Sequence, residues 1–141
     1  LSKAVGEDIC RSMGRTCGMS AVSLRFCRVL RPEAYNEVVG MAHENPKSAS
    51  SQMWTCIDVR DVAHACRMAT EQDGLDCEVF FISSSQTYME TPTRDLMAKY
   101  YPDAEDRYEG DDPYFSPFEN AKTLKVLGWE PLHHWRDNFQ Q

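Results

Sequence analysis

The cysteine, histidine and glycine spacings limit the chemistry that this sequence can support. Its six cysteines, at positions 10, 17, 27, 56, 66 and 77, never approach CxxC spacing, and its four histidines show no HExxH or Cys/His ligand pattern. We therefore expect no metal site, and interpret the cysteines as small buried hydrophobic residues with free thiols, typical of a reducing compartment. None of the seven glycines forms GxGxxG or GxxxxGK, the loops that hold phosphates.

Three side chains are candidates for ligand binding, each with an ordinary structural alternative. Arg28 follows a predicted strand, where a guanidinium group can pair bidentately with phosphate or lie free on the surface. Trp54 can stack on a base or sugar ring, or fill the core. Lys3 lies near the start of a predicted helix, where spacing alone predicts a solvated surface residue.

Alternating helices and strands must position these residues. Val5, Ile9 and Met13 recur every fourth residue, which predicts a helix over 1–17 that ends at Gly18. The alternating segment 19–26 predicts a strand. The remaining predictions are a helix over 31–43, a polar loop over 45–51, a strand over 54–57, a helix over about 60–72 with Val62, Ala65, Cys66, Met68 and Ala69 facing inward, a strand over 78–83, a helix from Thr91 as N-cap to Tyr100, and a helix from Ser116 to Gly128.

Polar residues at two of these boundaries, and one apolar run, predict local structure. Asp58 is placed to cap the 60–72 helix, and Asp61 puts a second carboxylate in its first turn. Ser116 and Glu119 have the spacing of a capping box. The run 79–82 is apolar without alternation, as in a strand covered on both faces of a parallel sheet. The sequence therefore predicts an α/β fold with crossover helices.

The composition is that of one packed domain. The chain has 141 residues, 42% of them hydrophobic, and a net charge of -7. Its 15 basic residues form no stripe, so we expect no nucleic-acid partner. No apolar run approaches the roughly 20 residues that span a bilayer, and no signal peptide is recognisable. We expect a cytoplasmic protein that does not interact with membranes.

Four motifs in order resemble the carboxyl half of one enzyme family. They are Ser2-Lys3-x-x-Gly6-Glu7, Leu24-Arg25-x-x-Val29-x-x-Pro32, Ile57-x-Val59-x-Asp61-Val62-Ala63, and Leu127-Gly128-Trp129-x-Pro131. The chain is similar to the extended short-chain dehydrogenase/reductases, the NAD-dependent epimerase/dehydratases of sugar-nucleotide metabolism. Residue 1 falls inside the first predicted helix, with no initiator Met and no leading strand. We therefore expect residues 1–141 to form a single α/β unit, the substrate-binding half of such an enzyme, without the amino-terminal dinucleotide-binding half.

The resemblance implies roles for individual residues. Lys3 matches the Lys of the family's Tyr-x-x-x-Lys pair, which lowers the pKa of the catalytic Tyr and bonds the nicotinamide ribose; that Tyr would lie two residues before Leu1. The backbone around Phe26, Cys27 and Val29 would pass the nicotinamide. Arg28 stands where the family has an Asn that contacts the substrate's diphosphate.

Two phosphate clamps of the family are altered in this sequence. Trp54 stands in place of one arginine, and Arg107 lies one position from the place of another, which falls at Tyr108. The resemblance therefore implies a substrate lobe around Arg28, Trp54 and Arg107, and puts a UDP-sugar substrate in doubt.

We therefore interpret the chain as the carboxyl-terminal part of a Rossmann-type parallel sheet, with covering helices and a small substrate-binding lobe. The parent enzyme would be an NAD- or NADP-dependent epimerase, dehydratase or reductase of a sugar nucleotide or related carbonyl or hydroxyl substrate. Alone, the chain is expected to be inactive and to bind neither dinucleotide tightly. The alternative is a non-catalytic interaction module, since an exposed first helix and strand edge favour a homodimer or larger homo-oligomer.

Overall fold

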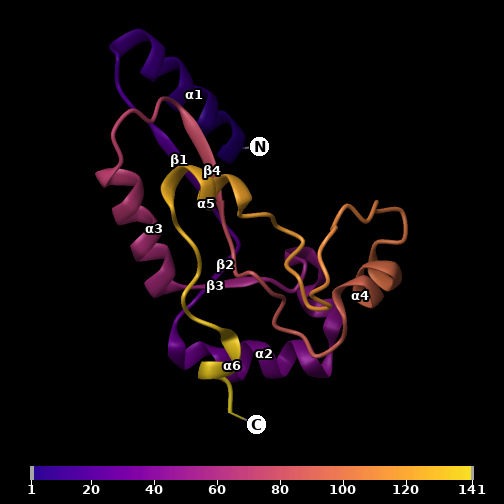
Figure 1. Ribbon diagram of the computed structural model, residues 1–141. Helices are drawn as coiled ribbons and strands as arrows, with labels where there is room; N and C mark the ends of the chain where they lie inside the picture. The colour runs from indigo at the N-terminus through magenta and orange to yellow at the C-terminus, as the bar shows by residue number, and fades with distance from the viewer. Residues whose placement is uncertain (1, 141) are drawn as a thin grey trace.

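The computed structural model describes residues 2–140 and has an α/β fold, as the sequence predicted (Figure 1). Helices alternate with short parallel strands along most of the chain. In order the elements are α1 Ser2–Cys17, β1 Val22–Phe26, β2 Arg28–Leu30, the 3-10 helix η1 Pro32–Ala34, α2 Tyr35–Glu44, the 3-10 helix η2 Pro46–Gln52, β3 Cys56–Asp58, α3 Val59–Glu71, β4 Glu78–Ile82, α4 Thr93–Tyr100, α5 Ala121–Leu127 and α6 Trp135–Asn138.

The strands form two parallel pairs rather than one continuous sheet. β1 pairs with β4, so that Leu24 lies opposite Phe80, and β2 pairs with β3, so that Val29 lies opposite Ile57. β2 was not predicted from the sequence, because it has only three residues and follows β1 after Cys27 alone. Both pairs are parallel because each partner is reached through a crossover that contains a helix.

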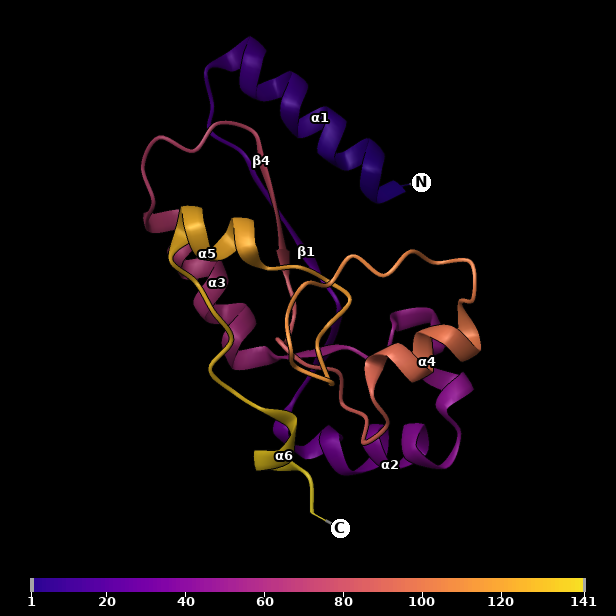
Figure 2. The same ribbon diagram turned by 45° about the vertical axis from the view of Figure 1, so that its right-hand side comes forward.

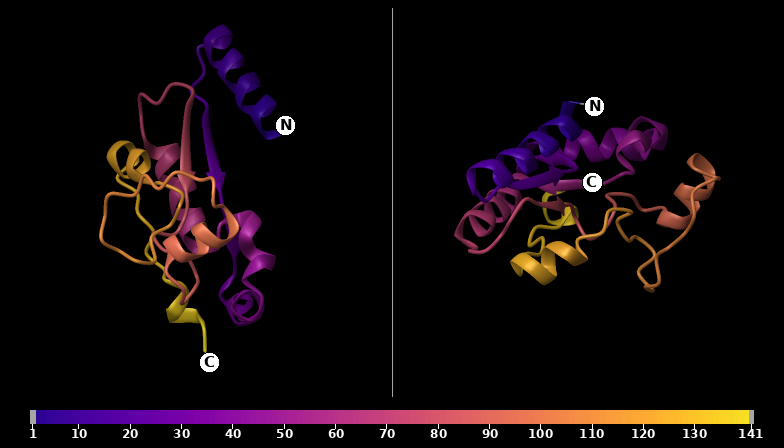
Figure 3. Two further views of the ribbon diagram at one scale, coloured as in Figure 1. Left: turned by 90° about the vertical axis from the view of Figure 1, so that its right-hand side faces the viewer. Right: turned by 90° about the horizontal axis from the view of Figure 1, so that it is seen from above.

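Two hydrophobic clusters hold the elements together. One joins α2, η2 and α4 around Tyr35, Val39 and Trp54, and the other joins β4, α3 and α5 around Phe80, Ile82 and Trp129. Figure 3 shows α1 and α5 on opposite sides of the β1–β4 pair. Burial of these apolar side chains is the main stabilising term for the fold.

α1 ends where the sequence predicted, but its apolar stripe faces solvent. Gly18 has the positive φ, 63°, that a helix C′ position requires. Val5, Ile9 and Met13 remain 48%, 57% and 49% exposed. α1 is attached through its other side, where Gly14 is buried against Cys77, and Figure 2 shows the helix standing away from the remaining elements.

Two predicted helix starts are wrong, and a distant contact explains each of them. α5 begins at Ala121 rather than at Ser116, because the Asn120 side chain holds the chain at the end of β4. Its amide donates to Ser83 O at 2.6 Å, and its oxygen accepts from Ser83 N at 3.2 Å. Similarly, α4 begins at Thr93, whose hydroxyl donates to Phe115 O at 2.8 Å, so Thr91 is not its N-cap.

Burial was overestimated at four further positions. Cys10, Cys17 and Cys66 are exposed, although all six thiols are free. Phe81 is 38% exposed, so the run 79–82 is not covered on both faces. Its ring stacks on Phe118, with centroids 5.9 Å apart, which accounts for an aromatic residue at this surface.

Candidate functional site

A cavity of about 1030 Å3 lies between α4 and the segment that follows it. The segment leaves α4 at Tyr101 and returns to the fold at Phe115, which forms an antiparallel bridge with Gln86. Asp112 secures the return, because its carboxylate accepts from Gln86 Nε2 at 2.7 Å and from Tyr114 N at 2.8 Å. Figure 2 shows this segment as an orange loop above α4. The segment therefore forms one wall of the cavity and α4 the other.

An aromatic pair forms one surface of the cavity. Tyr108 and Phe115 stack with centroids 3.9 Å apart and ring planes 10° from parallel. The Arg94 guanidinium carbon lies 5.8 Å from the centroid of Tyr108 and 5.7 Å from that of Phe115, within the range of a cation–π interaction. Met53 and Met97 add flexible apolar surface. Such a lining suits a ligand with an apolar body.

Both guanidinium groups at the cavity already have carboxylate partners. Arg94 Nε lies 2.6 Å from Asp106 Oδ2, and Arg107 Nη2 lies 2.6 Å from Glu105 Oε2. The hydrogen bond from Arg94 holds the pKa of Asp106 below its usual value. Arg107, a candidate residue of the substrate lobe, thus lines the cavity with a side chain that is 84% exposed.

The four consecutive residues predicted near a cofactor and substrate lie elsewhere, at the junction of β1 and β2. Phe26 and Val29 are each 42% exposed, so they present apolar surface to solvent. Cys27 and Arg28 are half-buried, and burial raises the pKa of the Cys27 thiol, whose sulfur lies 3.7 Å from Ile82 O. None of the four lines the cavity beside α4.

Arg28 has a buried phenol for a neighbour. Burial raises the pKa of Tyr88 to about 12, an effect that Cys56 reinforces and that the positive charge of Arg28 opposes. Tyr88 has no exposed surface. Arg28 is thus half-buried and close enough to Tyr88 for its charge to act on that phenol.

Trp54 belongs to the core rather than to a ligand site. Its side chain has no exposed surface, its Nε1 donates to Pro46 O at 2.7 Å, and its ring lies 5.4 Å from that of Tyr100. Its φ of 54° is left-handed, because the chain turns sharply here to enter β3. Of the two alternatives that the sequence left open, the structure shows core packing, and the predicted substrate contact is corrected accordingly.

Lys3 is exposed in the first turn of α1, outside the cavity lining. Its side chain makes no hydrogen bond or ion pair with any other residue in the described range 2–140. Of the predicted site residues the structure thus brings together Phe26, Cys27, Arg28 and Val29 by adjacency, and places Lys3 and Arg107 on separate elements.

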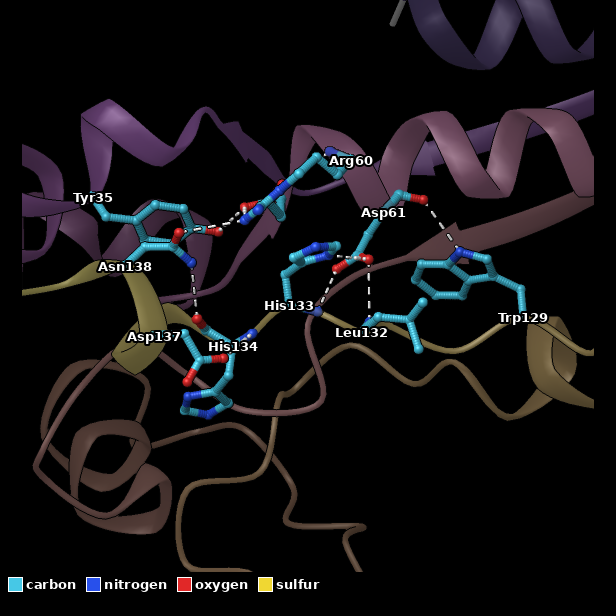
Figure 4. Close-up of polar contacts among 10 residues, drawn as sticks. Tyr35, Arg60, Asp61, Trp129, Leu132, His133, His134, Asp137 and Asn138 are labelled. Atoms are coloured by element: carbon cyan, nitrogen blue, oxygen red, sulfur yellow. Dashed lines mark hydrogen bonds and ion pairs between the residues drawn. The ribbon is translucent and has the colours of Figure 1, made fainter.

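A second polar cluster fastens the carboxyl-terminal segment to the start of α3 (Figure 4). Asp61 is 1% exposed and accepts from the backbone N–H groups of Leu132 and His133 at 3.1 and 3.0 Å. His133 Nδ1 lies 2.8 Å from Asp61 Oδ1, and Trp129 Nε1 donates to Asp61 O at 3.2 Å. The cluster explains why Asp61 tolerates burial, since each carboxylate oxygen is hydrogen-bonded.

Asp58, three residues earlier, caps α3 as predicted. Its carboxylate accepts from Arg60 N at 2.9 Å and forms a two-point contact with the Arg60 guanidinium group, at 2.7 and 2.8 Å. Burial acts to raise the pKa of Asp58, but the hydrogen bonds from Arg60 outweigh it and lower the pKa. Tyr35 donates a further hydrogen bond to the same carboxylate at 3.2 Å.

Comparisons with known proteins bear on the fold of this chain. Neither a protein-family model nor a curated protein matches it. Among solved structures, RMD from Pseudomonas aeruginosa, determined in complex with NADPH, matches 97% of this chain with a TM-score of 0.58. The chain has the fold of half of that protein.

The match to RMD is a match of fold. The two sequences are 17% identical over the aligned part, and the chain spans 51% of the length of RMD. The likeness agrees with the predicted fold, which is part of a Rossmann-type chain with short parallel strands. Within the described residues, no helix is both long and apolar enough to cross a bilayer, and no three His, Cys, Asp or Glu side chains lie together as metal ligands would.

Most of the cavity was not predicted from the sequence. Arg94 contributes positive charge to it, and Tyr108 and Phe115 form its aromatic surface, yet they come from α4 and from a segment without periodicity. Their only local signal is composition: residues 101–118 combine tyrosine and phenylalanine with many carboxylates. That signal marks an unusual loop, but does not show which residues of α4 face it.

Proposed function

We propose that this chain is the substrate-binding portion of an NAD- or NADP-dependent oxidoreductase of the extended short-chain dehydrogenase/reductase type. One observation carries the proposal: nearly the whole chain shares its fold with half of a protein that binds NADPH. The proposed substrate is a sugar nucleotide or a related molecule with a carbonyl or hydroxyl group. The cavity beside α4 is the proposed substrate site.

The residues present fit one end of a dinucleotide cofactor. Phe26 and Val29 offer exposed apolar surface to a nicotinamide ring, whereas the sequence contains no glycine-rich loop to hold a pyrophosphate. A nicotinamide, when bound, supplies or accepts a hydride. In a longer chain with a Tyr four residues before Lys3, the Lys3 ammonium group would lower the phenol pKa and favour proton exchange with the substrate oxygen.

Dinucleotide binding by two chain lengths tests this proposal. The 141-residue chain and the product of a reading frame extended upstream would each be titrated with NADPH and NADH, followed by nicotinamide fluorescence. We expect saturable binding by the longer chain and weak or no binding by the shorter one. Saturable binding at low micromolar concentration by the shorter chain, or none by the longer one, would contradict the proposal.

The second candidate function is a non-catalytic module that acts by association. Its motivation is the exposed stripe of Val5, Ile9 and Met13 on α1, together with the edge of β1 away from β4, which pairs with no other strand of residues 2–140. Unpaired strand edges and bare apolar faces favour association with another chain. We expect at least a dimer in sedimentation equilibrium, and a stable monomer at tens of micromolar would exclude this candidate.

A further inference from the structure

The cavity between α4 and the following segment has a negatively charged lining. Four carboxylates and two guanidinium groups contribute to it, so its formal charge is −2; they belong to Glu105, Asp106, Glu109, Glu119, Arg94 and Arg107. A site that grips a diphosphate presents the opposite balance, because two or more negative charges must be neutralised there. The lining therefore disfavours phosphate esters.

Neither arginine at the cavity is available to an anion without the loss of an existing partner. Arg94 Nε lies 2.6 Å from Asp106, and its Nη2 donates to Tyr108 O at 3.0 Å. Arg107 contacts Glu105 with two nitrogens, at 3.0 and 2.6 Å. A phosphate would have to displace a carboxylate that stays nearby, so repulsion from that carboxylate would offset the attraction to the arginine.

The other two carboxylates have no such partners. Glu109 and Glu119 are exposed, and neither forms an ion pair or a hydrogen bond with any residue of the described chain. Both line the cavity, so their charge is not neutralised by a neighbouring cation of the described chain. The remaining lining is largely apolar and includes the stacked rings of Tyr108 and Phe115 and the thioether of Met97.

We propose that this cavity binds a small organic cation, an amine with an aromatic or other apolar body, in preference to a phosphate-bearing ligand. The ammonium group would lie toward Glu109 and Glu119, and the apolar body against Tyr108, Phe115 and the methionines. The inference deepens the proposed function, on which it rests for the identification of the cavity as a substrate site. Of the substrates named above, it excludes the sugar nucleotide from this cavity and leaves a carbonyl or hydroxyl compound that carries an amine.

Three probes that share a phenyl ring but differ in charge test the preference. Ligand-observed NMR would compare 2-phenylethylamine, 2-phenylethanol and phenyl phosphate against the 141-residue chain at low salt. We expect the amine to bind about tenfold more tightly than the alcohol, and phenyl phosphate to bind most weakly. The preference for the amine should shrink in 0.5 M NaCl, because the carboxylates are exposed to solvent.

Charge-removing variants assign the preference to this cavity. The double variant Glu109→Gln with Glu119→Gln should lose most of the amine preference, and its folding is safe because both side chains are exposed and unpaired within residues 2–140. A matched control, Glu37→Gln with Asp73→Asn, removes the same charge from exposed positions on α2 and in the loop after α3, outside the cavity lining. The control should keep the preference.

Three outcomes would overturn the inference: phenyl phosphate binding as tightly as the amine, equal losses in both double variants, or no binding by any probe. None of the probes contains a dinucleotide, so these outcomes are separate from the NADPH titration. If the cavity prefers amines but the extended chain binds no NADPH, the oxidoreductase proposal is refuted and the cation site still stands.

Discussion

Replacement of Asp61 by alanine tests whether the cluster in Figure 4 holds the carboxyl-terminal segment in place. The carboxylate is 1% exposed and accepts three hydrogen bonds, from Leu132 N, His133 N and His133 Nδ1. Alanine removes all three acceptors and leaves two backbone N–H groups of the segment without their protein partner. The variant also loses a negative charge in the first turn of α3.

The expected loss of stability follows from these contacts. A hydrogen bond to a charged group contributes about 1.5–3 kcal/mol, but the three bonds share one carboxylate and are not additive. Removal of one partner from a buried charged cluster costs about 3–5 kcal/mol, which we take as the range for Asp61→Ala. Asp61→Asn keeps one acceptor and the side-chain volume, and should cost about 2 kcal/mol.

Urea denaturation followed by tryptophan fluorescence measures the loss. With a slope of about 2 kcal/mol/M, the midpoint of Asp61→Ala should fall by about 1.5–2.5 M. Trp129 reports the change directly, since its Nε1 donates to Asp61 O. The control Asp73→Ala, at an exposed loop position, should stay within about 0.5 kcal/mol of the parent. A loss below about 1 kcal/mol for Asp61→Ala would refute this account of the cluster.

Three further predictions concern α1 and acid stability. Gly14→Ala should destabilise the protein by about 1–3 kcal/mol in urea denaturation, because the new Cβ would overlap the sulfur of Cys77. The control Gly6→Ala, whose Cβ would meet nothing within 4 Å, should stabilise the protein by up to about 1 kcal/mol. Equal effects of the two substitutions would contradict the packing of α1. Ile9→Glu should leave the urea midpoint unchanged but reduce any self-association seen by sedimentation, since its side chain is 57% exposed; unchanged association would exclude the stripe as an interface. The lowered pKa of Asp58 contributes stability that is present above its unfolded pKa of about 3.9 and is lost as the pH falls through the lower folded value. Asp58→Asn should therefore weaken the dependence of the free energy of unfolding on pH below about 4. The same pH dependence in the variant and the parent would contradict this.

Features set by neighbours in the sequence were predictable. Asp58 caps α3 through the N–H group two residues ahead, and Gly18 ends α1 because its φ of 63° suits glycine. The α/β class followed from the alternation of elements, and it agrees with the half-chain match to RMD. For the cap of α3 and the end of α1, the deciding interaction spans only a few residues.

Features set by distant contacts were not predictable. The start of α5 depends on the amide of Asn120, which bonds to Ser83, 37 residues earlier. Trp54 entered the core because a left-handed turn directs it there, and sequence spacing carries no sign of that turn. The cavity exists because the chain returns from α4 to Gln86, which closes a loop of irregular structure.

The nucleotide sequence upstream of the Leu1 codon tests the central proposal most directly. An open reading frame that encodes Tyr two residues before Leu1, with a glycine-rich phosphate-binding loop further upstream, is the predicted result. It would complete the Tyr-x-x-x-Lys pair with Lys3 and supply a pyrophosphate cradle. A start codon immediately upstream would contradict the oxidoreductase proposal and favour the interaction module.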